Sequence, residues 1–350
     1  MRVLVTRTDR LGDLVLSLPV LDHLHRTHPD WDLQVMVAPA CVPLVENHPA
    51  VSAVWTWHEF MSASEKADLI FRLCRAEFDA ALLLQYRREL AQLLKKAGIA
   101  RRHGPWSKPS SWFLLNRGTW QSRSRGHDHE ADYNLALATR LAGTGGDAPL
   151  PVIHLADGQR QSGVDFRARD AAGADTVVLV HPGSGGSALD WLPARYAGVA
   201  NALAAQTGFR VFITGAERDR TMVEYVASYL TDEVTVLLGK YDLRQFLGVL
   251  SGADLLIAPS TGPLHLAAAL GVGAVGLYPP VRTMSPERWG PRGRFTATVV
   301  PEVTCPARRL CVEDRCRLYN CMDAVYERDV LAAALDLVRQ RDTRLAKDAD

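Results

Sequence analysis

The sequence lacks an excess of charge of either sign and any long uninterrupted hydrophobic run. Its 40 Lys and Arg are balanced by 39 Asp and Glu, which gives a net charge of +1 over 350 residues. Without a bulk basic field to release counterions from phosphates, we expect no nucleic-acid partner. The longest apolar run, at 266–281, is shorter than the roughly 18 residues of a membrane-spanning helix and is broken by glycines and prolines.

Cysteine is also scarce, since six residues in 350 are too few for a disulfide scaffold. Four of them follow one another near the end with the spacing C-x5-C-x4-C-x4-C: Cys305, Cys311, Cys316 and Cys321. This spacing does not match the paired C-x2–4-C of structural zinc sites, so we expect no metal, and the role of these cysteines stays open. Four charged residues, Arg7, Asp9, Arg10 and Asp13, interrupt the apolar stretch of the first 15 residues, which therefore do not resemble a signal peptide, so we expect a cytoplasmic protein.

Short β-branched segments alternate with amphipathic ones in two runs, separated by a Gly-, Asp- and Pro-rich stretch at 142–174 that we interpret as a linker. This pattern predicts an α/β fold of two Rossmann-like, doubly wound domains that face each other across a cleft. We place the domains at 1–150 and 151–324, with a closing helix at 325–350. The expected strands are 3–6, 33–38, 52–57, 81–84, 176–181, 209–214, 234–239, 254–259 and 274–279, and the expected helices include 14–28, 194–206, 221–230, 243–250 and 264–270.

Two loops of the second half have the composition of phosphate-binding loops. HPGSGGSALDW, which holds Ser184 and Gly185, follows a strand, and its glycines permit close approach to a phosphate. It also fits the spacing of a dinucleotide fingerprint, but the proline after it and the lack of a later acidic residue weaken that reading. A glycine-rich connection without a ligand is the other alternative.

The second loop, PSTGPLHLAAALG, begins a helix with Ser260 or Thr261 as the N-cap. Hydroxyls, the positive helix end and His265 could together stabilise a departing diphosphate. The alternative is a well-capped helix with a half-buried histidine and no ligand. Two such loops in one half favour a nucleoside diphosphate.

In the first half, Gly12 and Asp13 directly follow the first strand. A carboxylate in the first turn of a helix is kept ionised by the helix dipole and could accept a proton from an incoming hydroxyl. The alternative is a helix cap without a catalytic role.

Farther on, residues 87–125 carry ten Lys or Arg against one acid, interleaved with three Trp and one Phe. Such a surface suits an anionic headgroup or a phosphorylated saccharide, single-stranded nucleic acid, or solvent alone.

Five segments together resemble glycosyltransferase family 9, the heptosyltransferases of lipopolysaccharide core assembly. They are RTDRLGDLVLSLP, VLVHPGSGGSALDWLP, FITGAERD, the 237–271 block and the Cys-rich tail ending in CMDAV. The resemblance covers nearly the whole length. It implies a GT-B fold, with the acceptor on the first domain, a nucleotide-sugar on the second, and a last helix that crosses back to the first domain.

The resemblance also implies roles for individual residues. Asp13 matches the catalytic base, Ser184 a hydroxyl on the donor phosphate, and Glu217 or Asp219 a carboxylate near the nucleoside. The diphosphate-binding helix start is matched by Thr261, Gly262 and His265. Two positions depart from the family pattern: Ser260 replaces an Asp, and Leu189 replaces a Lys, whose charge Arg282 or Arg288 could supply.

These observations predict an inverting, metal-independent glycosyltransferase that needs no cofactor and moves heptose from ADP-heptose to a lipopolysaccharide core or related glycolipid. The donor-binding residues are then Ser184, Gly185, Glu217, Asp219, Ser260, Thr261, Gly262, His265 and Arg282, and the acceptor-binding residues are Arg10, Gly12, Arg101, Arg102 and Trp106. The anionic acceptor implies peripheral contact with the cytoplasmic face of the inner membrane. Alternatives are a transferase with another nucleotide-sugar, a non-catalytic binding protein, a sugar epimerase and a nicotinamide-dependent oxidoreductase.

Overall fold

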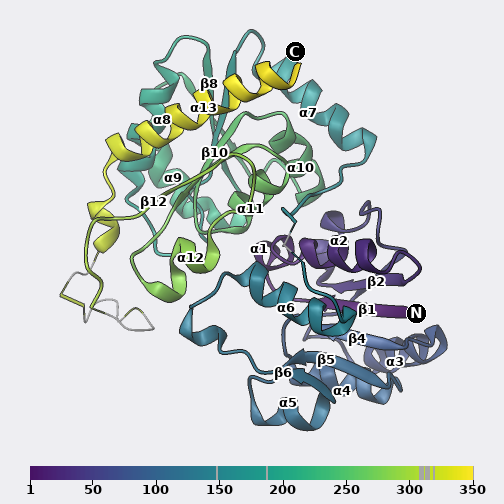
Figure 1. The fold of residues 1–350 in the computed structure, drawn as a ribbon. Coiled ribbons are helices and arrows are strands. Elements are labelled where there is room, and N and C mark those ends of the chain that lie inside the picture. The colour runs from purple at the N-terminus through teal and green to yellow at the C-terminus, as the bar shows by residue number, and fades with distance from the viewer. Residues whose placement is uncertain (147–148, 187, 307–310, 312–315, 318–319, 350) are drawn as a thin grey trace. The chain divides into compact units, whose positions relative to one another are not determined.

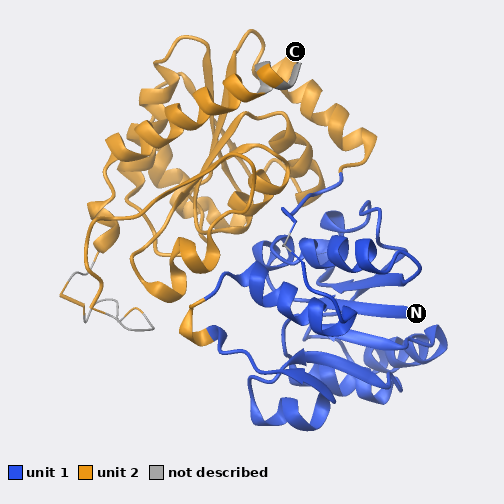
Figure 2. Cartoon of the chain, viewed as in Figure 1, with its two compact units in different colours: residues 1–123, 128–154 blue, residues 124–127, 155–350 orange. Residues whose placement is uncertain are grey.

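The computed structural model describes residues 1–146, 149–186, 188–306, 311, 316–317 and 320–349. The chain divides into two compact units (Figure 2), the first of residues 1–123 and 128–154 and the second of residues 124–127 and 155–350. Strands and helices alternate along the chain in both units (Figure 1). No helix in the described residues is long and apolar enough to cross a bilayer.

The first unit is built on a parallel sheet with the strand order β3-β2-β1-β4-β5-β6. Its strands are β1 (Arg2–Arg7), β2 (Asp32–Val37), β3 (Ala53–Thr56), β4 (Ala80–Leu83), β5 (Arg101–Pro105) and β6 (Arg117–Thr119). Its helices are α1 (Leu11–Val15), α2 (Leu18–Thr27), η1 (Pro39–Leu44), α3 (Ala63–Ala76), α4 (Arg88–Lys96), α5 (Pro109–Leu114), η2 (Arg123–Arg125, which reaches into the second unit) and α6 (Glu130–Ala142).

Helices cover both faces of this first sheet because its central strands are apolar on both sides. The β1 residues from Val3 to Val5 are at most 2% exposed. On one face, Leu4 and Leu83 pack with Leu73 of α3 and Leu90 of α4. On the other face, α2 packs against α6 (Figure 1).

The second unit has a parallel sheet with the order β12-β11-β10-β7-β8-β9. Its strands are β7 (Thr176–Val180), β8 (Phe209–Gly215), β9 (Val234–Leu238), β10 (Leu255–Pro259), β11 (Gly273–Leu277) and β12 (Thr296–Val299). Its helices are α7 (Asp157–Asp170), α8 (Pro193–Ala204), η3 (Glu217–Asp219), α9 (Arg220–Ala227), α10 (Leu243–Ser251), α11 (Gly262–Ala269), η4 (Arg282–Met284), α12 (Pro286–Trp289), η6 (Cys321–Ala324) and α13 (Glu327–Ala349).

The two sheets share one topology, so the predicted α/β class with two doubly wound domains is confirmed. In each sheet the strand order reverses beside the first strand of the unit, between β1 and β4 and between β7 and β10. Ligands of doubly wound sheets bind at this switch point, beyond the carboxyl ends of the strands. The loops that follow β1, β7 and β10 therefore occupy the positions where a site is expected.

Several elements differ from the sequence prediction. The interpretation of 142–174 as a linker was wrong in part, because α7 occupies 157–170 and packs on α10. A Cβ on Gly163 would lie 2.5 Å from Ser251 Oγ, so the two helices touch through small residues rather than through an apolar stripe. The expected helix at 14–28 is broken between α1 and α2. The strands β5, β6 and β12 were not predicted, because two are short and polar and one is a short edge strand.

The closing helix α13 packs on α8 and on β12 of the second unit. Its buried residues Val330, Ala334 and Leu337 belong to the same hydrophobic core as Val178 of β7. These contacts hold α13 within the second unit, whereas the sequence predicted that segment 325–350 crosses back to the first domain. That crossing stays a prediction.

Candidate active site

Asp13 lies at the carboxyl edge of the first sheet, where a buried arginine holds it. Arg7, the last residue of β1, is 3% exposed and donates from Nη2 to Asp13 Oδ1 at 2.5 Å. The same guanidinium donates to Asp9 Oδ1 at 2.7 Å and to Glu130 Oε1 at 2.8 Å. Arg123 also pairs with Glu130, at 2.5 Å. Two cations and three carboxylates therefore fix the orientation of the Asp13 side chain.

The surroundings of Asp13 tune its protonation. Burial raises the pKa of Asp13 to about 6, with Arg7 opposing the rise and Asp9 and Glu130 adding to it. Burial alone would lower the pKa of Arg7, but the three carboxylates raise it overall. The expected helix dipole has little effect on Asp13 because α1 has only five residues, so burial and the ion network set its ionisation instead. A carboxylate with this pKa is ionised at neutral pH and can still accept a proton.

Three of the predicted acceptor residues lie at this edge of the sheet. Arg10 is the exposed N-cap of α1, and Gly12 is in the first turn beside Asp13. Trp106 follows β5 and is half-buried against β6, where a Cβ on Gly118 would fall 1.8 Å from the Trp106 Nε1. Trp106 therefore supports the end of β6 and leaves only part of its ring exposed.

Arg101 and Arg102 lie at the opposite edge of the sheet. They are the first two residues of β5, and Arg101 is paired in register with Ala80 at the start of the parallel strand β4. Arg102 donates from Nε to the carbonyl oxygen of Leu114 at 2.8 Å. The structure thus does not bring these arginines together with Asp13. Their predicted role in acceptor binding rested on the local density of positive charge, which does not indicate at which end of a strand a residue lies.

In the second unit, the glycine-rich loop after β7 rests on buried polar side chains. His181 Nδ1 lies 3.0 Å from Thr214 Oγ1, and His181 Nε2 lies 3.9 Å from Asp219 Oδ2. Burial lowers the pKa of His181 to about 4, so the ring is neutral at pH 7. Asp219 accepts a hydrogen bond from the Ala216 N–H at 3.0 Å, and a Cβ on Gly183 would lie 2.4 Å from Asp219 Cγ. Asp219 therefore packs directly against Gly183 of the glycine-rich loop.

Two consecutive residues of the loop have a backbone conformation that glycine adopts readily. Gly185 and Gly186 both adopt a positive φ, of 52° and 73°, which a residue with a side chain rarely adopts. The Ser184 hydroxyl accepts a hydrogen bond from the Gly186 N–H at 3.2 Å. Ser184 and Gly185 thus lie at the predicted edge of the sheet, and their contact with a donor phosphate stays a prediction.

The two predicted nucleoside carboxylates differ in availability. Glu217 is 68% exposed, binds Arg220 at 2.6 Å and lies beside Gly239, where a Cβ would be 2.8 Å from Glu217 Oε2. Its ion pair with Arg220 lowers the pKa of Glu217. Asp219 is only 5% exposed and already engaged beneath Gly183. The geometry therefore leaves Glu217 as the carboxylate that a nucleoside could reach.

The start of α11 directly follows β10, next to the glycine-rich loop. β10 and β7 are neighbouring strands, and the His181 N–H donates to the Ile257 carbonyl oxygen at 2.9 Å. Thr261 occupies the N-cap position, yet its buried hydroxyl has no hydrogen-bond partner within the described residues. Ser260, the other predicted cap, shares a hydrogen bond with the Tyr278 hydroxyl. Gly262 is the first residue of the helix, and His265 is buried one turn later.

Cations near these loops include one that the sequence analysis missed. Arg282 is exposed in η4, after β11, whereas Arg288 is buried with its guanidinium over the Trp289 ring at 4.3 Å. Arg218 lies over the glycine-rich loop, since a Cβ on Gly185 would be 3.5 Å from Arg218 Nε. In the described ranges Arg218 forms no ion pair. Arg218 stands in the FITGAERD segment between Glu217 and Asp219, and the resemblance assigned a role only to these two carboxylates.

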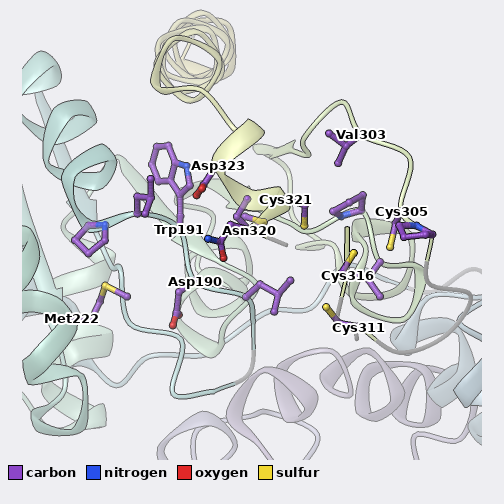
Figure 3. A pocket seen from close by; sticks show the side chains of 17 residues that line it. Asp190, Trp191, Met222, Val303, Cys305, Cys311, Cys316, Asn320, Cys321 and Asp323 are labelled. Carbon is purple, nitrogen blue, oxygen red and sulfur yellow. The ribbon is translucent and has the colours of Figure 1, made fainter. Parts of the chain in front are cut away.

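The cysteine-rich tail borders a separate pocket of the second unit, with a volume of about 390 Å³. Figure 3 shows the four cysteines on one side of this pocket and Trp191 and Met222 on the other. Trp191 donates to the Val325 carbonyl oxygen at 3.0 Å and so anchors the tail. Burial, with the neighbouring thiols, raises the pKa of Cys321. Within the described residues, no group of three or more His, Cys, Asp or Glu side chains is placed to hold a metal ion.

Comparison with known proteins decides the family. The model of glycosyltransferase family 9 (heptosyltransferase) matches residues 67–314, which is more than half of the chain. The chain belongs to glycosyltransferase family 9. The lipopolysaccharide core heptosyltransferase OpsX of Haemophilus influenzae is 26% identical over 292 residues, which cover 80% of each protein.

Solved structures of family 9 show the same fold. A family 9 glycosyltransferase of Veillonella parvula has a TM-score of 0.82 at 19% identity, with 97% of each chain covered. The Escherichia coli ADP-heptose lipopolysaccharide heptosyltransferase II has a TM-score of 0.78 at 21% identity, with 98% of this chain and all of that chain covered. The predicted GT-B fold and the predicted glycosyltransferase class are therefore confirmed. The roles of the individual site residues stay predictions.

Proposed function

We propose that this family 9 glycosyltransferase moves heptose from ADP-heptose to a lipopolysaccharide core or a related anionic glycolipid, with inversion at the anomeric carbon. The names of its relatives support the substrate class, since one is a lipopolysaccharide core heptosyltransferase and another an ADP-heptose heptosyltransferase. The observation that carries the chemistry is the Asp13 carboxylate. It is fixed by Arg7 at the carboxyl edge of the first sheet, and burial raises its pKa to about 6.

In the proposed reaction Asp13 accepts the proton of an acceptor hydroxyl. The oxygen then attacks the anomeric carbon, the bond from that carbon to the diphosphate oxygen breaks, and ADP leaves with its electron pair. Arg7 keeps the carboxylate oriented before and after the proton arrives. The acceptor would lie on domain 1–150, against Arg10, Gly12 and Trp106.

The departing diphosphate would lie on domain 151–324, between the loops after β7 and β10. The Thr261 hydroxyl and the backbone N–H groups at the start of α11 would donate to it, and the helix dipole favours its negative charge. Arg218 and Arg282 would add the positive charge that Leu189 does not supply. Because these groups can neutralise the leaving group, we propose that transfer does not require a metal ion.

A nucleotide panel tests the donor. Calorimetric titration of the purified chain with ADP, UDP, GDP and CDP, in the presence of a chelator, should show selective binding of ADP. Transfer from ADP-heptose to a purified core oligosaccharide, followed by mass spectrometry and NMR of the new linkage, should then give the inverted anomer. Preference for UDP or GDP would support a family 9 transferase with another donor, which the Ser260 and Leu189 departures make the main alternative.

A further inference from the structure

The amino-terminal unit carries exposed aromatic residues beside the proposed acceptor site. Trp112 and Phe113 of α5 are 54% and 79% exposed, and Trp120, just after β6, is 71% exposed. The rings of Trp112 and Trp120 lie 6.3 Å apart, and Phe113 is the next residue of α5 after Trp112. We name these three residues the aromatic tip. Large exposed aromatic patches are uncommon on proteins that act alone in water.

The aromatic tip is firmly supported from beneath. Ser111, between the exposed residues and the core, is completely buried and donates to the Lys108 carbonyl oxygen at 2.6 Å. The Tyr86 hydroxyl donates to Ser110 Oγ at 2.8 Å, and Leu115 is 1% exposed. The exposed rings therefore belong to a segment that is already folded against the sheet and α4 (Figure 1).

Basic side chains lie in or next to the elements that carry the aromatic tip and in α4, which packs on α5. Lys95 and Lys96 end α4, which packs on α5; Lys108 precedes α5; and Arg117 begins β6. All four are exposed, and in the described part of the chain none forms an ion pair. We name these four residues the basic rim. The one acid of the region, Glu89, lies instead beside Lys66, at 3.7 Å.

The position of the aromatic tip relates it to the reaction. Thr6 of β1 is in register with Leu83 of β4, and Gly104 of β5 with Gly118 of β6. Asp13 and Trp120 therefore follow strands that end at the same edge of one sheet, three strand spacings apart. With about 4.8 Å between neighbouring strands, roughly 14 Å separates the two strand ends.

We propose that the aromatic tip and its basic rim form a docking surface for an anionic phospholipid bilayer. Aromatic rings partition into the interfacial region of a bilayer, and lysine and arginine around them attract anionic headgroups. Docking here would present the carboxyl edge of the first sheet, with Asp13, to lipids in the same leaflet. This inference goes beyond the proposed transfer, and its test needs neither donor nor acceptor.

The test is sedimentation of the full chain with vesicles of phosphatidylethanolamine and phosphatidylglycerol, compared with vesicles of phosphatidylcholine. We expect at least about tenfold stronger binding to the anionic vesicles, and a loss of that preference at high salt. The triple variant Trp112→Ser, Phe113→Ser, Trp120→Ser should bind at least about tenfold more weakly. The matched control Tyr225→Ser, 60% exposed in the second unit, should bind like the parent.

A second variant probes the charges without touching the rings. Replacing all four residues of the basic rim by Ala should remove the preference for anionic vesicles and flatten the salt dependence. ADP titration and the midpoint of urea unfolding should be unchanged in both variants, which separates docking from folding and from the proposed transfer.

Three outcomes would overturn the proposal. The first is equal vesicle binding by the parent and the triple aromatic variant. The second is a concentration-dependent dimer that the triple variant abolishes, because the aromatic tip would then join two copies of the chain. The third is single-stranded nucleic acid that competes with the vesicles and binds more tightly than they do.

Discussion

The carboxyl edges of the two sheets have the same topology but opposite electrostatic character. In the first unit, Arg7 and its three carboxylates satisfy one another in a buried network. In the second unit, the Thr261 hydroxyl lacks a partner among the described residues, and Arg218 lies exposed over the loop at Gly185. This difference supports the proposed division of roles, in which the first edge controls one proton and the second receives an anion.

The largest effect is expected from Asp13→Asn. The amide keeps the shape of the side chain and can still accept from Arg7, but it cannot take a proton. Turnover should fall by about 10³-fold, since general bases contribute about 10² to 10⁴. ADP binding, measured by calorimetry, should be unchanged. Turnover within about tenfold of the parent would contradict the assignment of the base.

The pH profile gives the matched control for Asp13. With a pKa of about 6, kcat/KM should fall tenfold for each pH unit below about 6 and level off above it. Asp9 contributes to the raised pKa of Asp13, so Asp9→Asn should keep activity and move the acid limb to lower pH.

Stability provides a second readout of the same group. Because the folded pKa of Asp13 is raised, its stabilising contribution is complete below its unfolded pKa and is lost as pH rises through about 6. Asp13→Asn should therefore gain stability relative to the parent between pH 5 and 8.

Arg7→Met should cause the largest loss of stability, because it leaves three buried carboxylates without their shared cation. Breaking a buried ion pair from one side costs about 3–5 kcal/mol. Urea unfolding at pH 7.5 measures this loss. Arg2→Met is the control at the other end of β1, where Arg2 pairs with Asp32 at 2.6 Å with 43% of its side chain exposed. That surface pair should contribute about 0–1 kcal/mol. Equal losses in both variants would mean that the network does not hold the first unit together.

Thr261→Val tests the second edge. The hydroxyl has no partner to lose within the described residues, so folding stability should stay the same or rise slightly. ADP affinity should fall about tenfold, by the loss of one donor to a phosphate. Thr214→Val is the control, since the Thr214 hydroxyl contacts His181 at 3.0 Å. It should lose about 1 kcal/mol of stability. If Thr261→Val destabilised the protein and left ADP binding intact, its hydroxyl would have a structural role only.

The sequence predicted which residues lie at the carboxyl ends of the strands better than it predicted the side-chain contacts that those residues make. Hydrophobic periodicity located β1, β7 and β10. Because ligands of doubly wound sheets bind beyond the carboxyl ends of the strands, the residues just after each strand could be predicted as site residues. The ion network around Asp13 could not be predicted from the sequence, because Glu130 and Arg7 are 123 positions apart in the chain. The acceptor role of Arg101 and Arg102 rested on local charge, and their strand placed them at the other edge. The helix α7 was not predicted, because its buried residues include Gly163 and Phe166 but form no continuous apolar stripe.

Arg218→Ala is expected to have the smallest effect and tests how the second edge compensates for Leu189. Arg218 is exposed, so water and salt screen its charge, and ADP affinity should fall only about threefold to tenfold. The dependence of ADP binding on salt should weaken at the same time. Adding Leu189→Lys to this variant should restore affinity, because it returns a cation to the same loop. Arg160→Ala, an exposed arginine of α7, should change neither quantity. If the double variant did not recover, the diphosphate would lie away from this loop, and Arg282 would become the cation to replace next.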